Sequence, residues 1–341
     1  MMQNKTFFDV CSGIGGGRLG LEKCGLKSIG YSDTSRLAET TYKLLFNTDN
    51  EKNYGNIKRI KANDLPDFDV LIAGFPCQSF SVIGRKEGFD DPRGQLIFYI
   101  AEIINSKRPK CFLLENVKGL VTHDNGNTFK AIIKKLESIN YEVVYKVIKS
   151  TECGIPQNRQ RVYIVGFNKD YKFDISNYSF PSNIKKKSIK NFLVNDIKAT
   201  KEDLYYFNYY LKNSTNKGKY TLKDILDMEG KILDRRMNDL RIYSEYMPTL
   251  RAQKDGIFYV NNHELYSLSG YEALLFQGFG KRYANKVKNI VSNRHLLMQA
   301  GNAMTVNVIY EIGKTINKFV EEEFSLWVKR GKNLKTNVIT T

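Results

Sequence analysis

The chain has 341 residues, of which 42% are hydrophobic and 26% charged, as is usual for a globular protein. It has no apolar run of about 18 residues and no N-terminal apolar segment typical of a signal peptide, so we expect a cytoplasmic protein without a membrane span. Its 53 basic and 36 acidic residues give a net charge of +17, which favours a polyanionic partner such as nucleic acid. An AT-rich genome, which encodes many lysines, would produce the same charge.

The five cysteines argue against a disulfide framework and a zinc site. Their number is odd, they form no CxxC pair, and the three histidines lie far apart. We therefore expect no metal. Cys11 and Cys111 lie in apolar runs and fit small buried residues. Cys77 differs, because Pro76 precedes it and polar residues follow it.

The first half of the chain alternates short apolar runs with helical patterns. The apolar runs predict strands at 6–11, 28–32, 70–73, 111–114, 143–148 and 162–167. Amphipathic patterns between them predict helices at 37–46, 96–105 and 128–139. Such alternation indicates an α/β fold with a mostly parallel sheet covered by helices. Ligands of such sheets bind beyond the carboxyl ends of the strands.

A glycine-rich loop at 9–17 follows the first predicted strand. Its glycines let the backbone approach a ligand, and amides at a helix start can hold a phosphate or the carboxylate of S-adenosylmethionine. Arg18 stands where a nicotinamide-binding loop would have its third glycine. Asp33, which ends the second strand, could accept hydrogen bonds from ribose hydroxyls or cap a helix. Asn56 could bind an adenine amino group or belong to a turn.

Cys77 lies in a loop just after the apolar run at 70–73. A thiol at a strand end is placed for nucleophilic attack. The basic, glycine-containing segment at 79–94 would suit a lid that closes over a polyanion. From these residues alone, an inert thiol in a surface loop is the alternative.

Three further polar side chains border predicted strands. Glu115 follows the fourth strand and could hold a proton in a closed apolar site, or accept backbone amides at a helix start. Arg159 and Arg161 precede the last strand and, two residues apart, would point the same way toward a phosphate or carbonyl oxygen, unless both are solvated. Asp33, Cys77 and Glu115 all follow strands, so we expect them to converge.

The second half of the chain changes in character from about residue 181. Basic clusters, including the lysine run 185–187, punctuate a stretch rich in tyrosine and asparagine. We predict a helix at 302–320 that returns to the first domain. The predicted domains are a catalytic and cofactor-binding domain at 1–190 that is completed by 300–328, a smaller second domain at 191–273, and a hinge at 274–299.

Taken together, the motifs resemble those of the bacterial DNA (cytosine-5-)-methyltransferases, especially the short members of restriction–modification systems. The matching segments, in the family's order, are 9–17, 74–81, 115–117, 157–163 and 301–308. The resemblance implies the Rossmann-like fold of S-adenosylmethionine-dependent methyltransferases with a smaller target recognition domain. It also implies S-adenosyl-L-methionine as cofactor and double-stranded DNA as partner. We expect a monomer. A cytosine-C5 methyltransferase of tRNA and a catalytically silent DNA-binding homologue are the alternatives.

The resemblance assigns the catalytic roles. Cys77 would attack C6 of a cytosine that has left the base stack, because the reacting carbon is out of reach inside a duplex. Glu115 would contact N3 and the exocyclic amine and support protonation, so that C5 takes the methyl group. Arg161 would hold the cytosine O2, and Arg159 would support the active-site loop.

Cofactor contacts are implied for Asp9, Cys11, Gly13, Gly15, Gly16, Asp33, Thr34, Asn56, Ile57, Pro76, Leu96 and Asn302. Some of these positions depart from the family pattern. Asp33-Thr34 replaces a glutamate that is often followed by a large residue, Asn56 stands where aspartate is frequent, and Cys11 stands where an aromatic residue is common. We expect these changes to affect cofactor affinity rather than the type of reaction.

DNA contacts are implied for Ser81, Arg85, Arg93, Asn238 and Arg241. Arg241 could read a guanine edge in the major groove, and Asn238 could fill the gap that the flipped base leaves.

Overall fold

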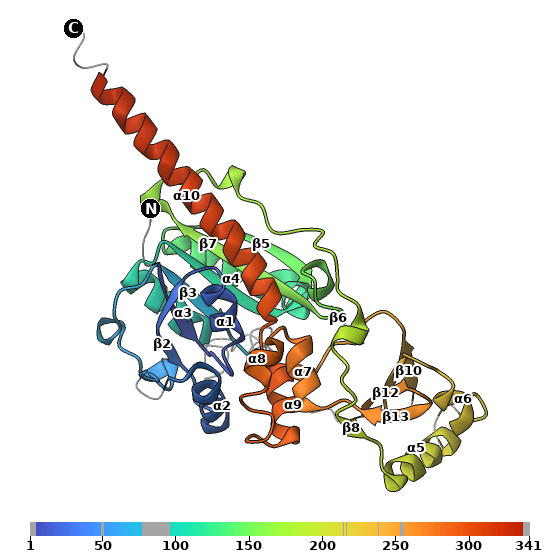
Figure 1. Cartoon of the computed structure of the whole chain (residues 1–341). Helices are drawn as coiled ribbons and strands as arrows, with labels where there is room; N and C mark the ends of the chain where they lie inside the picture. Colours follow the sequence, from blue (N-terminus) through green and yellow to red (C-terminus); the bar gives the residue numbers. More distant parts are fainter. Residues whose placement is uncertain are drawn as a thin grey trace.

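The computed structural model describes residues 5–48, 51–76, 96–213, 215, 217–237, 239–252 and 256–336, with side chains up to residue 326. Its larger sheet has the strand order β2-β1-β3-β4-β7-β5 (Figure 1). The strands are β1 (Thr6–Val10), β2 (Lys27–Ser32), β3 (Val70–Gly74), β4 (Cys111–Val117), β5 (Tyr141–Lys149) and β7 (Gln160–Asn168). The first four in this order pair in parallel, and β7 runs antiparallel between β4 and β5. The predicted mostly parallel α/β sheet is confirmed.

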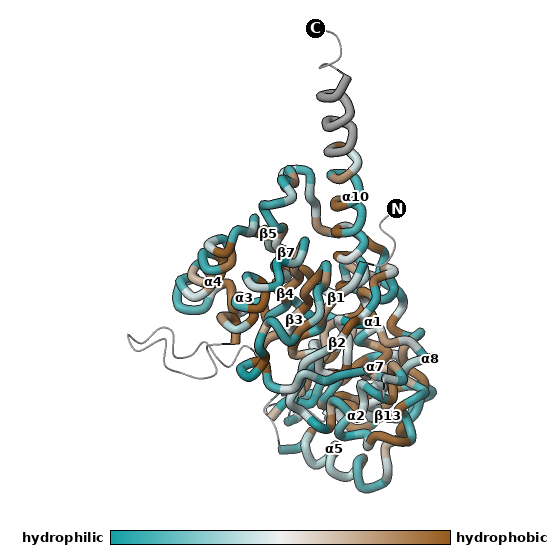
Figure 2. Tube along the Cα trace, turned by 90° about the vertical axis from the view of Figure 1, so that its left-hand side faces the viewer, coloured by the Kyte–Doolittle hydropathy of each residue, from teal (hydrophilic) through white to brown (hydrophobic). Residues whose placement is uncertain are grey.

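Helices cover both faces of this sheet. One face packs against α3 (Leu96–Lys107) and α4 (Asn127–Ser138), the other against α1 (Gly16–Glu22) and the long α10 (Val306–Thr336). Alternate residues of β3 and β4 enter the two cores, which explains why these strands are continuous apolar runs. Figure 2 shows hydrophobic colour around the central strands and hydrophilic colour on the outer turns of α4. Among the described residues, no helix has the length and apolar composition needed to cross a bilayer.

Short helical turns connect several of these elements. They are η1 (Ile57–Arg59), η2 (Ala62–Asp64), η4 (Lys118–Val121), η5 (His123–Gly126), η6 (Ser150–Glu152), η7 (Lys169–Tyr171), η8 (Ile175–Asn177) and η9 (Ile189–Asn191).

A second, antiparallel sheet has the order β10-β9-β12-β13-β8. Its strands are β8 (Ile197–Lys198), β9 (Ile232–Arg235), β10 (Leu240–Tyr243), β12 (Ile257–Asn261) and β13 (Glu264–Ser267). It packs against α5 (Lys201–Asn213) and α6 (Leu222–Leu226) around a core that includes Phe207, Leu233 and Phe258. The domain limits at 190 and 273 remain a prediction.

Two further groups of elements join the two sheets. The helices α2 (Arg36–Phe46), α7 (Gly270–Phe276), α8 (Gly280–Ala284) and α9 (Asn293–Asn302) contribute to one core that also contains β12 residue Tyr259. A parallel pair of short strands, β6 (Gln157–Asn158) and β11 (Met247–Pro248), fastens the segment after β10 next to the start of β7. The second sheet is therefore held close to one edge of the first (Figure 1).

The predicted helix at 302–320 is wrong at its start. Asn302 ends α9, and α10 begins only at Val306. A continuous helix would need the carbonyls of Gly301 and Ala303 for its own hydrogen bonds. Both accept hydrogen bonds from the buried guanidinium of Arg159 instead.

Candidate active site

Glu115 and Arg161 form a partly buried ion pair at the edge where the parallel strands end. Glu115 lies inside β4, two residues before its end, and not after the strand as expected. The strand is longer than predicted because β7 pairs with it as far as Val117, which stands opposite Arg161. Since β7 is antiparallel, its first residues reach the same edge.

The geometry of this pair leaves a carboxylate oxygen of Glu115 available to a ligand. Glu115 Oε1 lies 3.1 Å from Arg161 Nε, and the side chains are 10% and 15% exposed. This contact is close, but its angle is not that of a hydrogen bond, and Oε1 has no hydrogen-bond partner among the described residues. A carboxylate beside a guanidinium can bind the donor and acceptor edge of a planar base.

Asn116 connects this pair to the segment that leads to Cys77. Its buried side-chain amide donates to the carbonyl of Phe75 at 3.0 Å, and its own oxygen accepts from the amide of Val117. The end of β4 is thereby fixed to the chain two residues before Cys77. No separate role was expected for Asn116, although it stands next to Glu115 in the matching segment 115–117.

Arg159 has different partners from Arg161. Its guanidinium is buried and donates to the carbonyls of Leu250 at 3.0 Å, Gly301 at 3.1 Å and Ala303 at 3.0 Å. Burial and the nearby charge of Arg161 lower the pKa of Arg159 to about 10. The prediction that Arg159 points toward a phosphate or a carbonyl oxygen is therefore met by carbonyl oxygens of the protein's own main chain.

The glycine-rich loop is tied to the end of β2. The amide of Gly13 donates to Asp33 Oδ2 at 2.8 Å, and the other carboxylate oxygen accepts from the amide of Ser35. The alternative role of Asp33 as a helix cap is wrong, because the Ser35 side chain caps α2 by accepting from Ala38. Thr34 is exposed.

Several glycines of this loop serve packing. Gly13 has a φ of 55° and open space where a Cβ would lie. At Gly15 a Cβ would come within 2.4 Å of the Phe46 ring, and at Gly16 within 2.3 Å of the carbonyl oxygen of Met304. Gly16 thus allows the segment between α9 and α10 to approach, while Gly13 leaves room for a ligand.

Asp9 is a buried acid beneath the loop. Its pKa is raised to about 8 by burial, which the charge of Arg18 opposes. Arg18 is itself bound by Tyr42 and by both carboxylate oxygens of Glu51. Within the described part of the chain, neither Asp9 oxygen nor the hydroxyl of Ser12 has a hydrogen-bond partner. Buried polar groups without partners are typical of sites that a ligand or water completes.

The remaining cofactor candidates lie in ordinary local structure. Asn56 caps η1 by accepting from the amide of Lys58, so its turn role is the one observed. Cys11 follows β1 with a φ of 53°, and burial raises the pKa of its thiol to about 12. The observed strand β1 therefore ends at Val10, one residue earlier than predicted. The other candidates are the buried Ile57, the exposed Pro76, Leu96 at the start of α3, and the exposed Asn302 at the end of α9.

Several predicted site residues lie outside the described residues. They are Cys77, Ser81, Arg85, Arg93 and Asn238. Arg241 is described and stands exposed on β10, 3.4 Å from Asp239. Hydrogen bonds to Tyr243 and Asp239 raise its pKa.

Comparison with known proteins gives one family. Residues 5–318 match the family model described as C-5 cytosine-specific DNA methylase. The chain is 37% identical over 325 residues to the type II methyltransferase M1.ScrFI of Lactococcus lactis subsp. cremoris, covering 92% of this chain and 78% of that protein. It is 33% identical over 328 residues to the type II methyltransferase M.HhaI of Haemophilus parahaemolyticus, covering 91% and 95%.

Solved structures share the fold at low sequence identity. The Entamoeba histolytica methyltransferase EhMeth superposes with a TM-score of 0.69 at 16% identity and covers 95% of this chain and 99% of that one. A mutant DNMT2 of Spodoptera frugiperda gives a TM-score of 0.68 at 18% identity, covering 92% and 99%. These two similarities concern the architecture alone.

Proposed function

The chain belongs to the C-5 cytosine-specific DNA methylase family, and from this premise we propose how its residues carry out methylation of cytosine at C5 in DNA. The observation that carries the proposal is the Glu115–Arg161 pair, which lies at the edge where the strands end. Asn116 holds the chain that enters the Cys77 segment against the same strand. The carboxyl group and the guanidinium thus lie at one edge of one sheet. We assign the role of nucleophile to Cys77, which follows Pro76 in the chain.

The proposed reaction begins when the target cytosine leaves the base stack. The Cys77 thiolate forms a bond to C6, while Glu115 contacts N3 and the exocyclic amine and stabilises the electron density pushed into the ring. Arg161 donates to O2 and orients the base. S-adenosylmethionine, when bound, would supply the methyl group that C5 receives and would leave as S-adenosylhomocysteine. The C5 proton is then lost to solvent, its electron pair restores the C5–C6 double bond, and the bond between C6 and Cys77 breaks to return the thiolate.

The residues around the glycine-rich loop fit S-adenosylmethionine. The open space at Gly13 and the unpartnered carboxyl group of Asp9 offer room and an acceptor. Asp33 already accepts from Gly13 and Ser35, and its remaining lone pairs would serve a ribose hydroxyl. We assign the remaining cofactor contacts to Cys11, Gly15, Gly16, Thr34, Asn56, Ile57, Pro76, Leu96 and Asn302.

The similar curated proteins are type II methyltransferases, so the enzyme is proposed to be the modification enzyme of a restriction–modification system. The region at 191–273 is the proposed target recognition domain, with Arg241 as a reader of a guanine edge. Arg159 acts as a positioning residue. The enzyme is proposed to act as a monomer in the bacterial cytoplasm.

Bisulfite sequencing of plasmid DNA from an expressing host tests this function. We expect cytosines within one recurring short sequence to resist conversion when the wild-type enzyme is expressed. With Arg161→Ala, protection should fall at least a hundredfold in matched time courses, because the base loses its O2 donor and Glu115 its partner. Full conversion at every sequence with folded wild-type enzyme would refute the function.

A further inference from the structure

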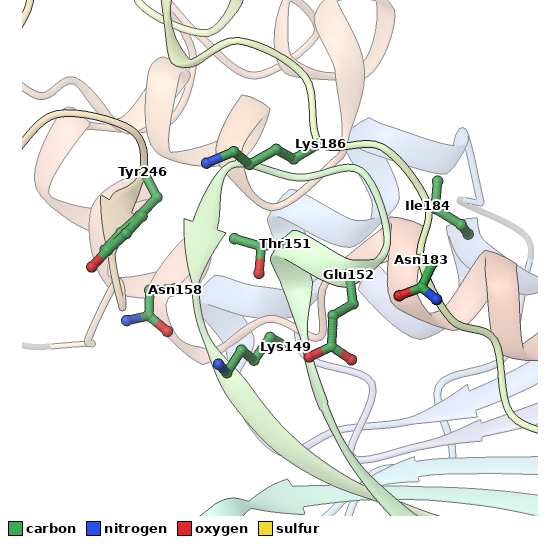
Figure 3. A pocket seen from close by; sticks show the side chains of 8 residues that line it. All are labelled: Lys149, Thr151, Glu152, Asn158, Asn183, Ile184, Lys186 and Tyr246. Carbon is green, nitrogen blue, oxygen red and sulfur yellow. The ribbon is translucent and has the colours of Figure 1, made fainter.

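A polar cavity of about 540 Å³ lies beside the catalytic strands, away from the glycine-rich loop. It is lined by Lys149, Thr151, Glu152, Asn158, Asn183, Ile184, Lys186 and Tyr246 (Figure 3). Lys149 ends β5 opposite Gln160, the residue before Arg161. Asn158 directly precedes Arg159. The cavity therefore adjoins the strand edge that carries the Glu115–Arg161 pair.

One wall of the cavity is basic and is held in place by backbone contacts. The amide of Ile184 donates to the carbonyl of Glu152 at 3.0 Å, and the amide of Lys187 donates to that of Gly154 at 3.1 Å. These hydrogen bonds fix the lysine run 185–187 alongside the segment that follows β5. Backbone hydrogen bonds at Ile184 and Lys187, before and after Lys186 in the chain, thus fix the position of Lys186.

The opposite wall comes from the proposed recognition domain. Tyr246 lies between β10, which carries Arg241, and β11, which pairs with β6. The amide of Met247 donates to the carbonyl of Pro156 at 2.7 Å, and the hydroxyl of Thr249 donates to the carbonyl of Asn158. The cavity is therefore framed on one side by catalytic strands and on the other by the segment that follows the recognition strand.

The lining offers cations and neutral donors. In Figure 3 the ammonium ends of Lys149 and Lys186 reach toward the side on which Asn158 and Tyr246 lie. Glu152 is the carboxylate of the lining, and Lys186 also pairs with Glu245 at 2.7 Å. That pair is exposed, and exposed pairs contribute little, so a stronger anion can displace the carboxylate.

We propose that this cavity seats backbone phosphates of the DNA substrate beside the target nucleotide. Lys149 and Lys186 provide the charge, and Asn158 and Tyr246 provide hydrogen-bond donors. The proposal rests on the proposed function, because it takes duplex DNA as the substrate of the adjoining edge. Contacts of this kind fix the register of a protein on DNA and carry no sequence information.

The test compares the double variant Lys149→Gln/Lys186→Gln with the control Lys134→Gln/Lys318→Gln. The control removes the same charge from exposed positions on α4 and α10. Binding of a mixed-sequence duplex is measured over a range of salt concentrations. We expect the cavity variant to flatten the slope of log K against log salt by about 2 and to raise Kd about tenfold or more at low salt. Methyl transfer at saturating DNA should keep its kcat.

Two outcomes would overturn the proposal. One is a slope and a Kd that match the control; the other is a fall in kcat at saturating DNA without a change in Kd. The conservative variant Lys149→Arg/Lys186→Arg should keep the wild-type slope, which separates loss of charge from misfolding. Failure of the proposed function is distinguishable, because wild-type enzyme would then transfer no methyl group to any mixed-sequence duplex.

Discussion

Arg159 and Arg161 are two residues apart, yet their surroundings give them different tasks. Arg161 stands beside a carboxylate with unused acceptor capacity, so it can share a planar ligand with Glu115. Arg159 is buried and donates to three main-chain carbonyls from distant segments. Although the two arginines are close in sequence, Arg161 can therefore contact a substrate, whereas Arg159 holds segments of the protein together.

Asp9 should make the stability of the cofactor-free enzyme depend on pH. Its pKa in the folded protein is about 8, well above the value of an unfolded chain. The folded state therefore binds the proton more tightly, and the resulting stability is complete at low pH and is lost as the pH rises toward and through 8. The fall can reach about 1.4 kcal/mol per pH unit.

Urea unfolding of wild type and Asp9→Asn between pH 5.5 and 8.5 measures this effect. The wild-type free energy of unfolding should decline with pH more steeply than that of Asp9→Asn, since the amide does not titrate. Parallel pH profiles would show that Asp9 does not carry the effect.

At the scale of elements, the link between α9 and α10 depends on close backbone contact. A Cβ on Gly301 would lie 2.4 Å from the carbonyl carbon of Arg251 and 2.5 Å from the amide nitrogen of Ala252. Backbone atoms cannot move aside as a flexible side chain can. The same glycine supplies one of the carbonyls that Arg159 binds, so the break between the helices and the guanidinium support each other.

Gly301→Ala should therefore destabilise the protein, by about 2 kcal/mol or more. Gly119→Ala is the matched control, because nothing lies within 4 Å of a Cβ at that position. Thermal unfolding should show a melting temperature lowered by several degrees for Gly301→Ala and a near-wild-type value for Gly119→Ala. Equal melting temperatures for the two variants would contradict the close contact.

The main sheet could be predicted from the sequence because its strands are buried on both faces and read as apolar runs. The break at 303–305 could not, since distant contacts of Arg159 and Gly301 decide it. The extent of β4 past Glu115 was missed for a similar reason, because its pairing with β7 is long-range. The second sheet has strands of two to five residues, too short to leave a clear pattern.

At the scale of the molecule, the second sheet is fastened beside the edge of the first sheet that carries the Glu115–Arg161 pair. The β6–β11 pair places the segment after Arg241 directly against the segment that carries Arg159. The cavity between these two segments carries lysine side chains in its lining. This is consistent with the polyanionic partner that the net charge of +17 predicts. The net charge and the family's motifs could be read from the sequence, whereas the cavity between the two parts could not.

The most direct test of the proposed mechanism is a covalent adduct with DNA in which the methylated cytosine is replaced by 5-fluorocytosine. Fluorine at C5 leaves no proton to remove, so the bond between Cys77 and C6 cannot break after methyl transfer. In the presence of S-adenosylmethionine, the wild-type enzyme should form a denaturant-stable complex with one duplex, and Cys77→Ser should form none while still binding DNA. An equal yield of adduct with Cys77→Ser would contradict the assignment of the nucleophile.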